Sequence, residues 1–135
     1  ILTILKETNI VKKKMQKILV TGGLGFIGSN LIKILLQNRF FVINIDKISY
    51  SSNFYNTKDF KKNRNYRFIK CDLNNKKKIS SILRKYKPSG IFNLAAETHV
   101  DRSIDNPDNF IKSNILGTFN LLECFRKYLF KNKDS

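Results

Sequence analysis

The chain has 135 residues, the size of one domain, which excludes a nucleotide-binding domain joined to a separate substrate domain. The composition is 41% hydrophobic and 12% aromatic with only 2 Pro and 6 Gly, which excludes collagen-like and low-complexity chains. The formal net charge is +16.

Two interpretations of this charge are open. Positive charge attracts nucleic acids and anionic membranes, so a basic nucleic-acid-binding module is one of them. The other is an A/T-rich gene, because Lys, Ile, Asn, Phe and Tyr supply 69 of the 135 residues. Arg, the usual reader of phosphates and base edges, occurs only 6 times. The scarcity of Arg favours the second interpretation, and we expect no nucleic-acid partner.

The cysteines and the apolar runs are unremarkable for a cytoplasmic protein. Cys71 and Cys124 fit neither a CxxC motif nor a metal-ligand spacing, so we expect two buried free thiols, a reducing compartment and no metal. No apolar run approaches 18 residues, and we expect no membrane partner.

The first 14 residues differ in character from the rest. The chain begins with Ile, and a run of three lysines at 12–14 precedes Met15. We interpret residues 1–14 as a disordered extension, Met15 as a candidate start, and 15–135 as the folded domain. A basic arm that contacts a partner is the alternative for 1–14.

The first half of the domain predicts strand, helix and strand. The apolar run 17–21 stops at two glycines and suits a strand buried on both faces. The helix that follows is expected to bury a stripe at helical spacing, made of Ile27, Leu31, Ile34 and Leu35. A second strand spans 41–45 and ends at Asp46. The polar segment 47–65 predicts an irregular excursion with a helical piece.

The second half predicts strands over 66–70 and 91–95, each followed by a helix. The first of these helices carries Ile79, Ile82, Leu83 and Tyr86 and ends at 88–90. Asn106 and Pro107 predict the cap and first position of the last helix, which runs to about 131. Its buried face is expected to hold Ile111, Ile115, Thr118, Leu122, Phe125 and Leu129.

The order of these elements predicts the fold class. Strands that alternate with helices over short connections form a parallel sheet with helices on both faces. We therefore expect an α/β fold, a Rossmann-like doubly wound parallel sheet, truncated after the fourth strand and its helix.

A glycine loop carries the first chemical motif. Gly22, Gly25 and Gly28 lie between a predicted strand and a predicted helix, the context that a dinucleotide-binding loop requires. Gly22 permits a tight turn, Gly25 lets the backbone approach a pyrophosphate, and Gly28 lets the helix pack on the strand. The free N–H groups at the helix N-terminus favour phosphate. A turn without a ligand is the alternative.

Carboxylates follow the second and third strands. Asp46 comes 18 residues after Gly28, where it can accept hydrogen bonds from ribose hydroxyls and would repel a 2′-phosphate. This favours NAD over NADP, although the neighbouring Lys47 leaves NADP open. Asp72 could contact the adenine or cap the helix that follows it.

The end of the fourth strand completes the candidate site. Small residues, Ala95 and Ala96, let a ligand approach the backbone at the edge where open parallel sheets bind ligands. Thr98 is the polar residue best placed to touch a substrate. The lone His99 is expected to be structural.

Four segments resemble the dTDP-glucose 4,6-dehydratase family of extended short-chain dehydrogenases/reductases: KILVTGGLGFIGSN, NIDKISY, LAAETHVDRSI and IKSNILGTFNLLE. The resemblance runs from residue 15 to about 130. It implies NAD as cofactor, a nucleotide-sugar substrate such as dTDP-glucose, and a homodimer. In the implied reaction the sugar is oxidised at C4, loses water across C5 and C6, and is reduced at C6, with NAD as hydride carrier. Another nucleotide-sugar epimerase or dehydratase of this superfamily is the alternative.

The resemblance also assigns roles to residues of this chain. Thr98 matches a substrate-contacting position. The implied cofactor-binding residues are Gly22, Gly25, Phe26, Ile27, Gly28, Asp46, Lys47, Ile48, Ser49, Asp72, Leu73, Leu94, Ala95, Ala96, Glu97 and Ser113.

This sequence departs from the family pattern in two ways. Leu24 replaces a usual Ala and Ser52 a usual Gly, without loss of a contact that the sequence identifies. Family members also continue into a Thr-Asp-Glu acid/base set and, beyond it, a Tyr-x-x-x-Lys pair. Thr-Asp-Glu does not occur in these 135 residues, and the one Tyr-x-x-x-Lys spacing, Tyr66 to Lys70, lies within the predicted strand 66–70, ahead of the segment where the family carries the pair. We therefore assign no catalytic residue, expect this chain alone to be inactive, and expect the edge of its fourth strand to be unpaired.

Overall fold

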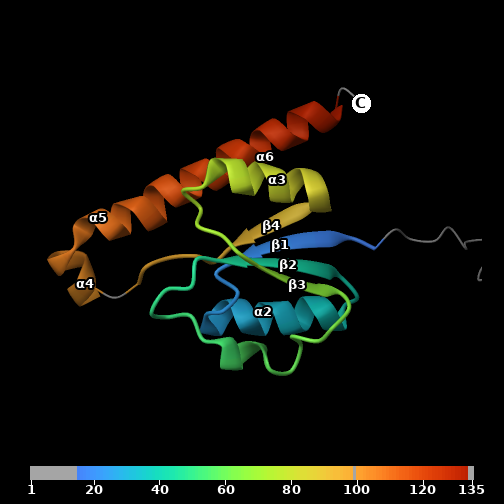
Figure 1. Ribbon diagram of the computed structural model, residues 1–135, viewed down its shortest axis with the longest axis horizontal. Helices are drawn as coiled ribbons and strands as arrows, with labels where there is room; N and C mark the ends of the chain where they lie inside the picture. Colours follow the sequence, from blue (N-terminus) through green and yellow to red (C-terminus); the bar gives the residue numbers. More distant parts are fainter. Residues whose placement is uncertain (1–14, 99, 134–135) are drawn as a thin grey trace, which may run out of the picture.

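The structure is a computed structural model that describes residues 15–98 and 100–133. Four strands form one parallel sheet in the order β3-β2-β1-β4 (Figure 1). The bounds of the strands are β1 (Lys17–Thr21), β2 (Phe41–Asp46), β3 (Tyr66–Lys70) and β4 (Gly90–Asn93). The predicted parallel α/β fold is confirmed. The predicted extension 1–14 and His99 lie outside the described residues.

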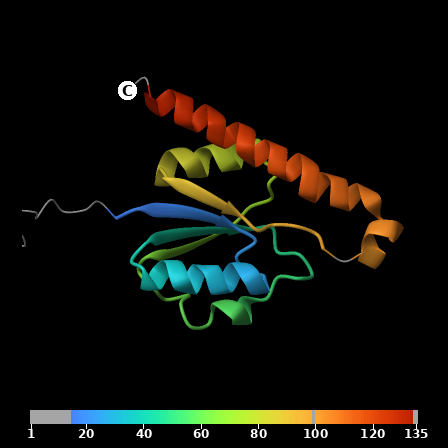
Figure 2. The same cartoon turned by 180° about the vertical axis from the view of Figure 1, so that it is seen from behind.

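Helices cover both faces of the sheet. One face carries α2 (Phe26–Gln37), and the other carries α3 (Lys76–Tyr86) and α6 (Gly117–Lys133), an arrangement that Figure 2 shows from behind. The loop after β2 contains the short η1 (Phe54–Thr57). A chain of short helices precedes α6: α4 (Val100–Asp105), α5 (Pro107–Phe110) and the π-helical η2 (Ile111–Leu116). Within the described ranges, no helix is long and apolar enough to cross a bilayer.

Strand side chains alternate between two cores. One core joins the sheet to α3 and α6 through Leu19, Ile43, Ile45, Ile79, Leu83 and Leu121. The other joins it to α2 through Ile18, Val20, Val42, Ile32 and Leu35. Burial of a large aliphatic side chain stabilises the fold by about 1.5–3 kcal/mol, so both faces contribute to holding the strand ends in place. The predicted free thiols are confirmed, since Cys71 and Cys124 are both buried and unbridged.

The predicted stripe on α2 is wrong at two positions. Ile27 and Ile34 are 69% and 56% exposed, whereas Gly28, Ile32 and Leu35 are buried. The buried set has the same helical spacing, turned by one residue, or about 100° around the helix. This rotation of the buried face follows from Gly28, because the absence of a side chain there lets α2 pack directly on the glycine loop.

The predicted face of the last helix is wrong at four of its six positions. Ile111, Ile115, Leu122 and Leu129 are exposed, whereas Thr118 and Phe125 are half-buried. The residues that α6 buries include Gly117, Leu121 and Cys124. The π-helical η2 before α6 provides a reason, because a wider turn holds extra residues and rotates the face of the helix that follows.

The fourth strand is shorter at its end than predicted. It starts at Gly90 and stops at Asn93, so Leu94 and Ala95 lie beyond it. The backbone N–H groups of Leu94 and Ala95 donate to Thr21 Oγ1 at 3.0 and 3.1 Å. Because these N–H groups donate to a side chain, β4 ends at Asn93, two residues before the end of the predicted strand 91–95.

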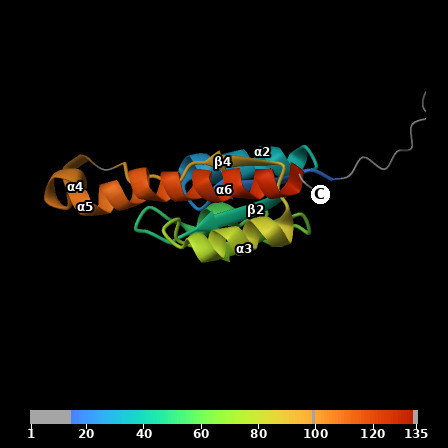
Figure 3. The ribbon, with the colours of Figure 1, turned by 90° about the horizontal axis from the view of Figure 1, so that it is seen from above.

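An apolar surface lies along the outside of η2 and α6. We call the α6 apolar face the set of exposed side chains Ile111, Ile115, Leu116, Phe119, Leu122, Leu129 and Phe130. Seen from above, α6 runs across the sheet over the edge strand β4 (Figure 3), and Asn93 Nδ2 of β4 donates to Thr118 Oγ1 of α6 at 3.2 Å. Phe92 on β4 is itself 43% exposed.

We expect a polypeptide of these 135 residues to self-associate through β4 and the α6 apolar face, because contiguous apolar area next to an open strand edge favours association. Light scattering after size exclusion should give a mass above that of one chain, 15.8 kDa. The charged double variant Phe119→Lys/Leu122→Lys should lower this mass. Ile34→Lys, an exposed isoleucine on α2, is the matched control. A monodisperse monomer for the parent chain would contradict the prediction.

Candidate functional site

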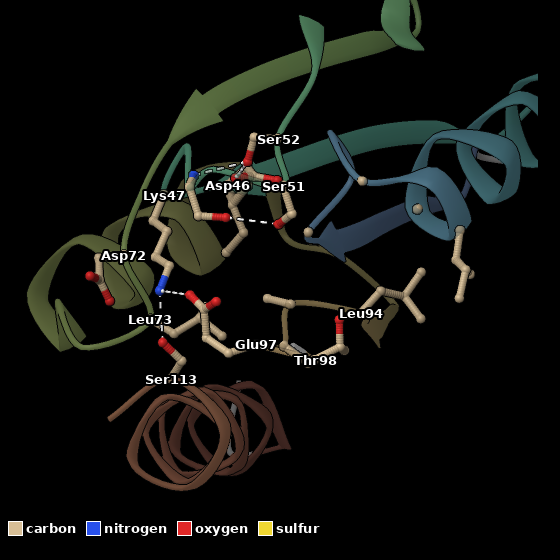
Figure 4. A pocket seen from close by; sticks show the side chains of 18 of the residues that line it. Asp46, Lys47, Ser51, Ser52, Asp72, Leu73, Leu94, Glu97, Thr98 and Ser113 are labelled. Atoms are coloured by element: carbon tan, nitrogen blue, oxygen red, sulfur yellow. Dashed lines mark hydrogen bonds and ion pairs between the residues drawn. The ribbon is translucent and has the colours of Figure 1, made fainter. Parts of the chain in front are cut away.

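A cavity of about 390 Å³ opens at the edge where all four parallel strands end (Figure 4). This volume lies in the range of small-molecule sites. Every residue predicted to bind cofactor or substrate lines the cavity except Ile48. Four residues that the sequence analysis did not assign to the site also line it: Ile45, Ser51, Ser52 and Cys71.

The glycine loop forms one wall. Gly22 has φ +67°, and its N–H donates to the carbonyl oxygen of Ile45 at 2.9 Å. A Cβ on Gly22 would lie 2.7 Å from Leu94 O and Ala95 N, and a Cβ on Gly28 would overlap Gly22 O. Gly25 is the N-cap of α2 and brings no side chain to the first turn. The N–H groups that begin α2 therefore face the cavity without a side-chain cap, as an anion site requires.

Asp46 forms the base of the second wall. Asp46 is only 7% exposed. Asp46 Oδ2 accepts from the Leu24 N–H at 3.2 Å, and Oδ1 accepts from the Ile48 N–H and the Ser52 hydroxyl, both at 2.8 Å. These three donors fix the orientation of the carboxylate at the end of β2.

Ile48 shapes the loop after Asp46 instead of lining the cavity. Its φ is +64°, which is rare for a β-branched residue and costs on the order of 1–3 kcal/mol. The Ile48 N–H bond to Asp46 Oδ1 helps to hold this conformation, which turns Ser49, Ser51 and Ser52 toward the cavity.

Lys47 joins three segments of the chain. Its Nζ lies 2.8 Å from Glu97 Oε1 and 2.7 Å from Ser113 Oγ (Figure 4). Glu97 is held from the other side as well, since its N–H donates to Asn114 Oδ1 and its carbonyl oxygen accepts from Asn114 Nδ2, at 2.8 and 2.9 Å. The Glu97 side chain is 10% exposed and that of Lys47 37%. The pair therefore fastens η2 to the ends of β2 and β4.

The end of β3 brings Cys71 and Asp72 to the cavity. Burial raises the pKa of the Cys71 thiol above its usual range, so the thiol stays protonated and is a weak nucleophile. Asp72 does not cap α3, because the cap is Asn75, whose side chain accepts from the Lys78 N–H at 3.0 Å. Asp72 Oδ1 instead accepts from the Asn74 N–H at 2.8 Å.

Sequence reasoning missed a buried amide beneath the glycine loop. Asn44 Oδ1 accepts from the Gly23 N–H at 3.1 Å, and its Nδ2 donates to the Tyr66 hydroxyl at 2.9 Å. Burial raises the pKa of Tyr66. A polar residue inside an apolar strand was the available signal, since a buried amide needs partners.

The donor set suits a dinucleotide more than a metal. Helix N–H groups and a glycine turn can hold a pyrophosphate, and the Asp46 carboxylate can accept from a ribose. Among the described residues, no group of His, Cys, Asp and Glu side chains could hold a metal ion.

Comparison with known proteins is consistent with this geometry. The family described as GDP-mannose 4,6 dehydratase matches residues 19–134. The dTDP-glucose 4,6-dehydratases of Neisseria meningitidis serogroup B and Salmonella typhimurium are each 44% identical over 84% of this chain. The chain spans about a third of the length of these relatives, 32% in both cases.

Solved structures give the same picture. The dTDP-glucose 4,6-dehydratase of Bacillus anthracis in complex with NAD is 37% identical with a TM-score of 0.74, over 84% of this chain and 34% of that one. The UDP-glucose 4-epimerase of Thermotoga maritima with UDP-glucose is 36% identical with a TM-score of 0.75, over 84% and 35%.

We predict that Lys47→Met lowers the free energy of unfolding by about 2 kcal/mol, because Glu97 loses a charge-assisted hydrogen bond in a nearly buried setting. Urea denaturation followed by circular dichroism measures this. Lys33→Met is the matched control, since the Lys33–Asp59 pair is exposed on both sides and contributes at most about 1 kcal/mol. An equal decrease in the free energy of unfolding in the two variants would contradict the prediction.

Proposed function

This chain belongs to the GDP-mannose 4,6 dehydratase family, and we propose that it forms the NAD-binding part of a dTDP-glucose 4,6-dehydratase. The observation that carries the proposal is the meeting of the glycine loop and Asp46 in one cavity. The relatives named dTDP-glucose 4,6-dehydratase support the substrate class, and the structural relative that contains NAD supports the cofactor.

The contacts of Lys47 support NAD over NADP. A 2′-phosphate at the end of β2 would need a cation to balance it. Lys47 is the neighbouring cation, and its ammonium is already bonded to Glu97 and Ser113. The phosphate would instead meet the carboxylate of Asp46, which repels it.

The proposed roles divide the site into three. The start of α2 holds the pyrophosphate, Asp46 and Ser49 hold the adenosine ribose, and Asp72 and Leu73 flank the adenine. On the nicotinamide side lie Leu94, Ala95, Ala96 and Glu97, with Ser113 from η2 and with Thr98 toward the sugar. NAD, when bound, supplies the hydride acceptor and donor, and the protein supplies its position and electrostatics.

A second candidate is a UDP-glucose 4-epimerase-like function, which the structural relative from Thermotoga maritima favours at 36% identity. The 44% identity to dTDP-glucose 4,6-dehydratases favours the dehydratase. The two differ in product, since only the dehydratase removes water and yields a 4-keto-6-deoxy sugar.

We further propose that the whole enzyme is a homodimer and works in the cytoplasm. The α6 apolar face offers the apolar area that a second copy would cover. The two free thiols suit a reducing compartment.

We predict that the chain binds NAD at least tenfold more tightly than NADP, as isothermal titration calorimetry would measure. Gly25→Val should weaken NAD binding by at least about tenfold, because a side chain would stand over the start of α2 while its Cβ meets only Gly22 O at 3.3 Å. Asn30→Ala, an exposed change on the same helix, is the control. Equal affinity for the two dinucleotides would contradict the NAD assignment.

We also predict that a polypeptide of these 135 residues forms no 4-keto sugar from dTDP-glucose and NAD. The Thr-Asp-Glu set that the resemblance implies does not occur in its sequence. The one Tyr-x-x-x-Lys spacing, Tyr66 to Lys70, lies on β3, where Tyr66 is buried and its hydroxyl accepts from Asn44, and neither residue lines the cavity. The absorbance of the 4-keto product in alkali is the readout, with a dehydratase of known activity as positive control. Product formation by the chain would overturn the division of roles proposed above.

A further inference from the structure

The Ser52 hydroxyl stands between the cavity and Asp46. Its oxygen accepts from the Ser49 N–H at 3.0 Å and lies 2.8 Å from Asp46 Oδ1. A serine hydroxyl has one proton, and an ionised carboxylate has none to give. Ser52 is therefore the donor to Asp46, and the bond from Ser49 helps to hold its oxygen in that place.

The carboxylate of Asp46 has few acceptor positions left. Each carboxylate oxygen offers two lone pairs. Oδ1 already accepts two donors, the Ile48 N–H and the Ser52 hydroxyl, and Oδ2 accepts the Leu24 N–H. A ribose edge with two hydroxyls needs two positions, so the carboxylate is one position short.

The three donors differ in how easily they can leave. The N–H groups of Leu24 and Ile48 belong to the backbone of the glycine loop and of the turn at positive φ, so their departure requires the chain to move. Ser52 leaves by rotation of one side-chain torsion. That rotation also removes the acceptor of the Ser49 N–H, so two hydrogen bonds are broken.

We propose that the Ser52 hydroxyl competes with one adenosine ribose hydroxyl for Asp46 and thereby lowers the affinity of the site for NAD. The inference rests on the proposed function, because it takes NAD as the ligand. Ser52 is therefore an affinity-determining residue. Its hydroxyl donates to Asp46 in the empty site, and this hydrogen bond breaks when the ribose binds.

The experiment compares NAD with two analogues that lack the 2′- or the 3′-hydroxyl of the adenosine ribose, by calorimetric titration of the parent chain and of Ser52→Ala. In the parent, at least one analogue should bind within about twofold of NAD, because Ser52 already occupies the position of its missing hydroxyl. In Ser52→Ala the same analogue should bind about three- to tenfold more weakly than NAD, the range of one net hydrogen bond.

The ratio of analogue to NAD affinity is the decisive quantity. Loss of the Ser49 N–H acceptor in Ser52→Ala loosens the loop for NAD and analogue alike, so this effect cancels in the ratio. Ser52→Thr keeps a hydroxyl and should retain the parent ratio. Ser51→Ala should do so too, since Ser51 lines the same cavity and its hydroxyl bonds to Ser49 Oγ at 2.9 Å.

Two results would overturn the inference in distinguishable ways. If Ser52→Ala binds NAD but leaves both ratios at the parent values, Ser52 does not compete with the ribose, and the proposed function stands. If the parent and Ser52→Ala are folded by circular dichroism and neither binds NAD, the inference and the proposed function both fail.

Discussion

The cavity depends on two contacts in which one backbone meets another with no side chain between them. The backbone of Gly22 lies against that of Leu94 and Ala95, and Gly28 lies against Gly22. The first contact brings the ends of β1 and β4 together, and the second sets the start of α2 over them. A methyl group at either glycine would separate these segments, so the cavity walls formed by the start of α2 and by Leu94 and Ala95 meet only because both positions lack a Cβ.

Side chains at the strand ends then connect what the glycines bring close. Thr21 holds the backbone of Leu94 and Ala95, Asp46 holds the glycine loop, and Lys47 reaches Glu97 and η2. All of them come from β1 or β2, or from the residue just after β2, because parallel strands end at one edge of a sheet. No buried side-chain polar atom of the described residues lacks a hydrogen-bond partner. The walls are therefore preorganised, and ligand binding has little ordering cost to meet.

The sequence predicted the strands and the position of the glycine loop better than the faces of the helices. An apolar run marks 17–21 well because the sheet buries that strand, and alternation of apolar and polar residues marks 66–70, the edge strand β3. Helical spacing shows that α2 and α6 have a buried face, but the rotation of that face follows from the Gly28 contact and from η2, which are tertiary. Asn44 stands out along the chain only as a polar residue in an apolar strand, and Thr21 and Ser52 carry no periodic pattern. Their partners lie in other segments or depend on a loop conformation, so only the fold reveals their roles.

The charge of the chain and the charge of the site are opposite. Among the described residues that line the cavity, Lys47 is the one Lys or Arg, against Asp46, Asp72 and Glu97. The net charge of +16 therefore lies elsewhere on the molecule and does not attract phosphate into the cavity by proximity. Without a spare cation, the negative charge of a pyrophosphate has to be met by the backbone N–H groups and the dipole at the start of α2. Under the proposed function, a pyrophosphate at the glycine loop would meet these N–H groups, whereas a 2′-phosphate near Asp46 would meet a carboxylate and no unengaged Lys or Arg among the described residues that line the cavity. Tolerance of the first and discrimination against the second would then follow from the same arrangement.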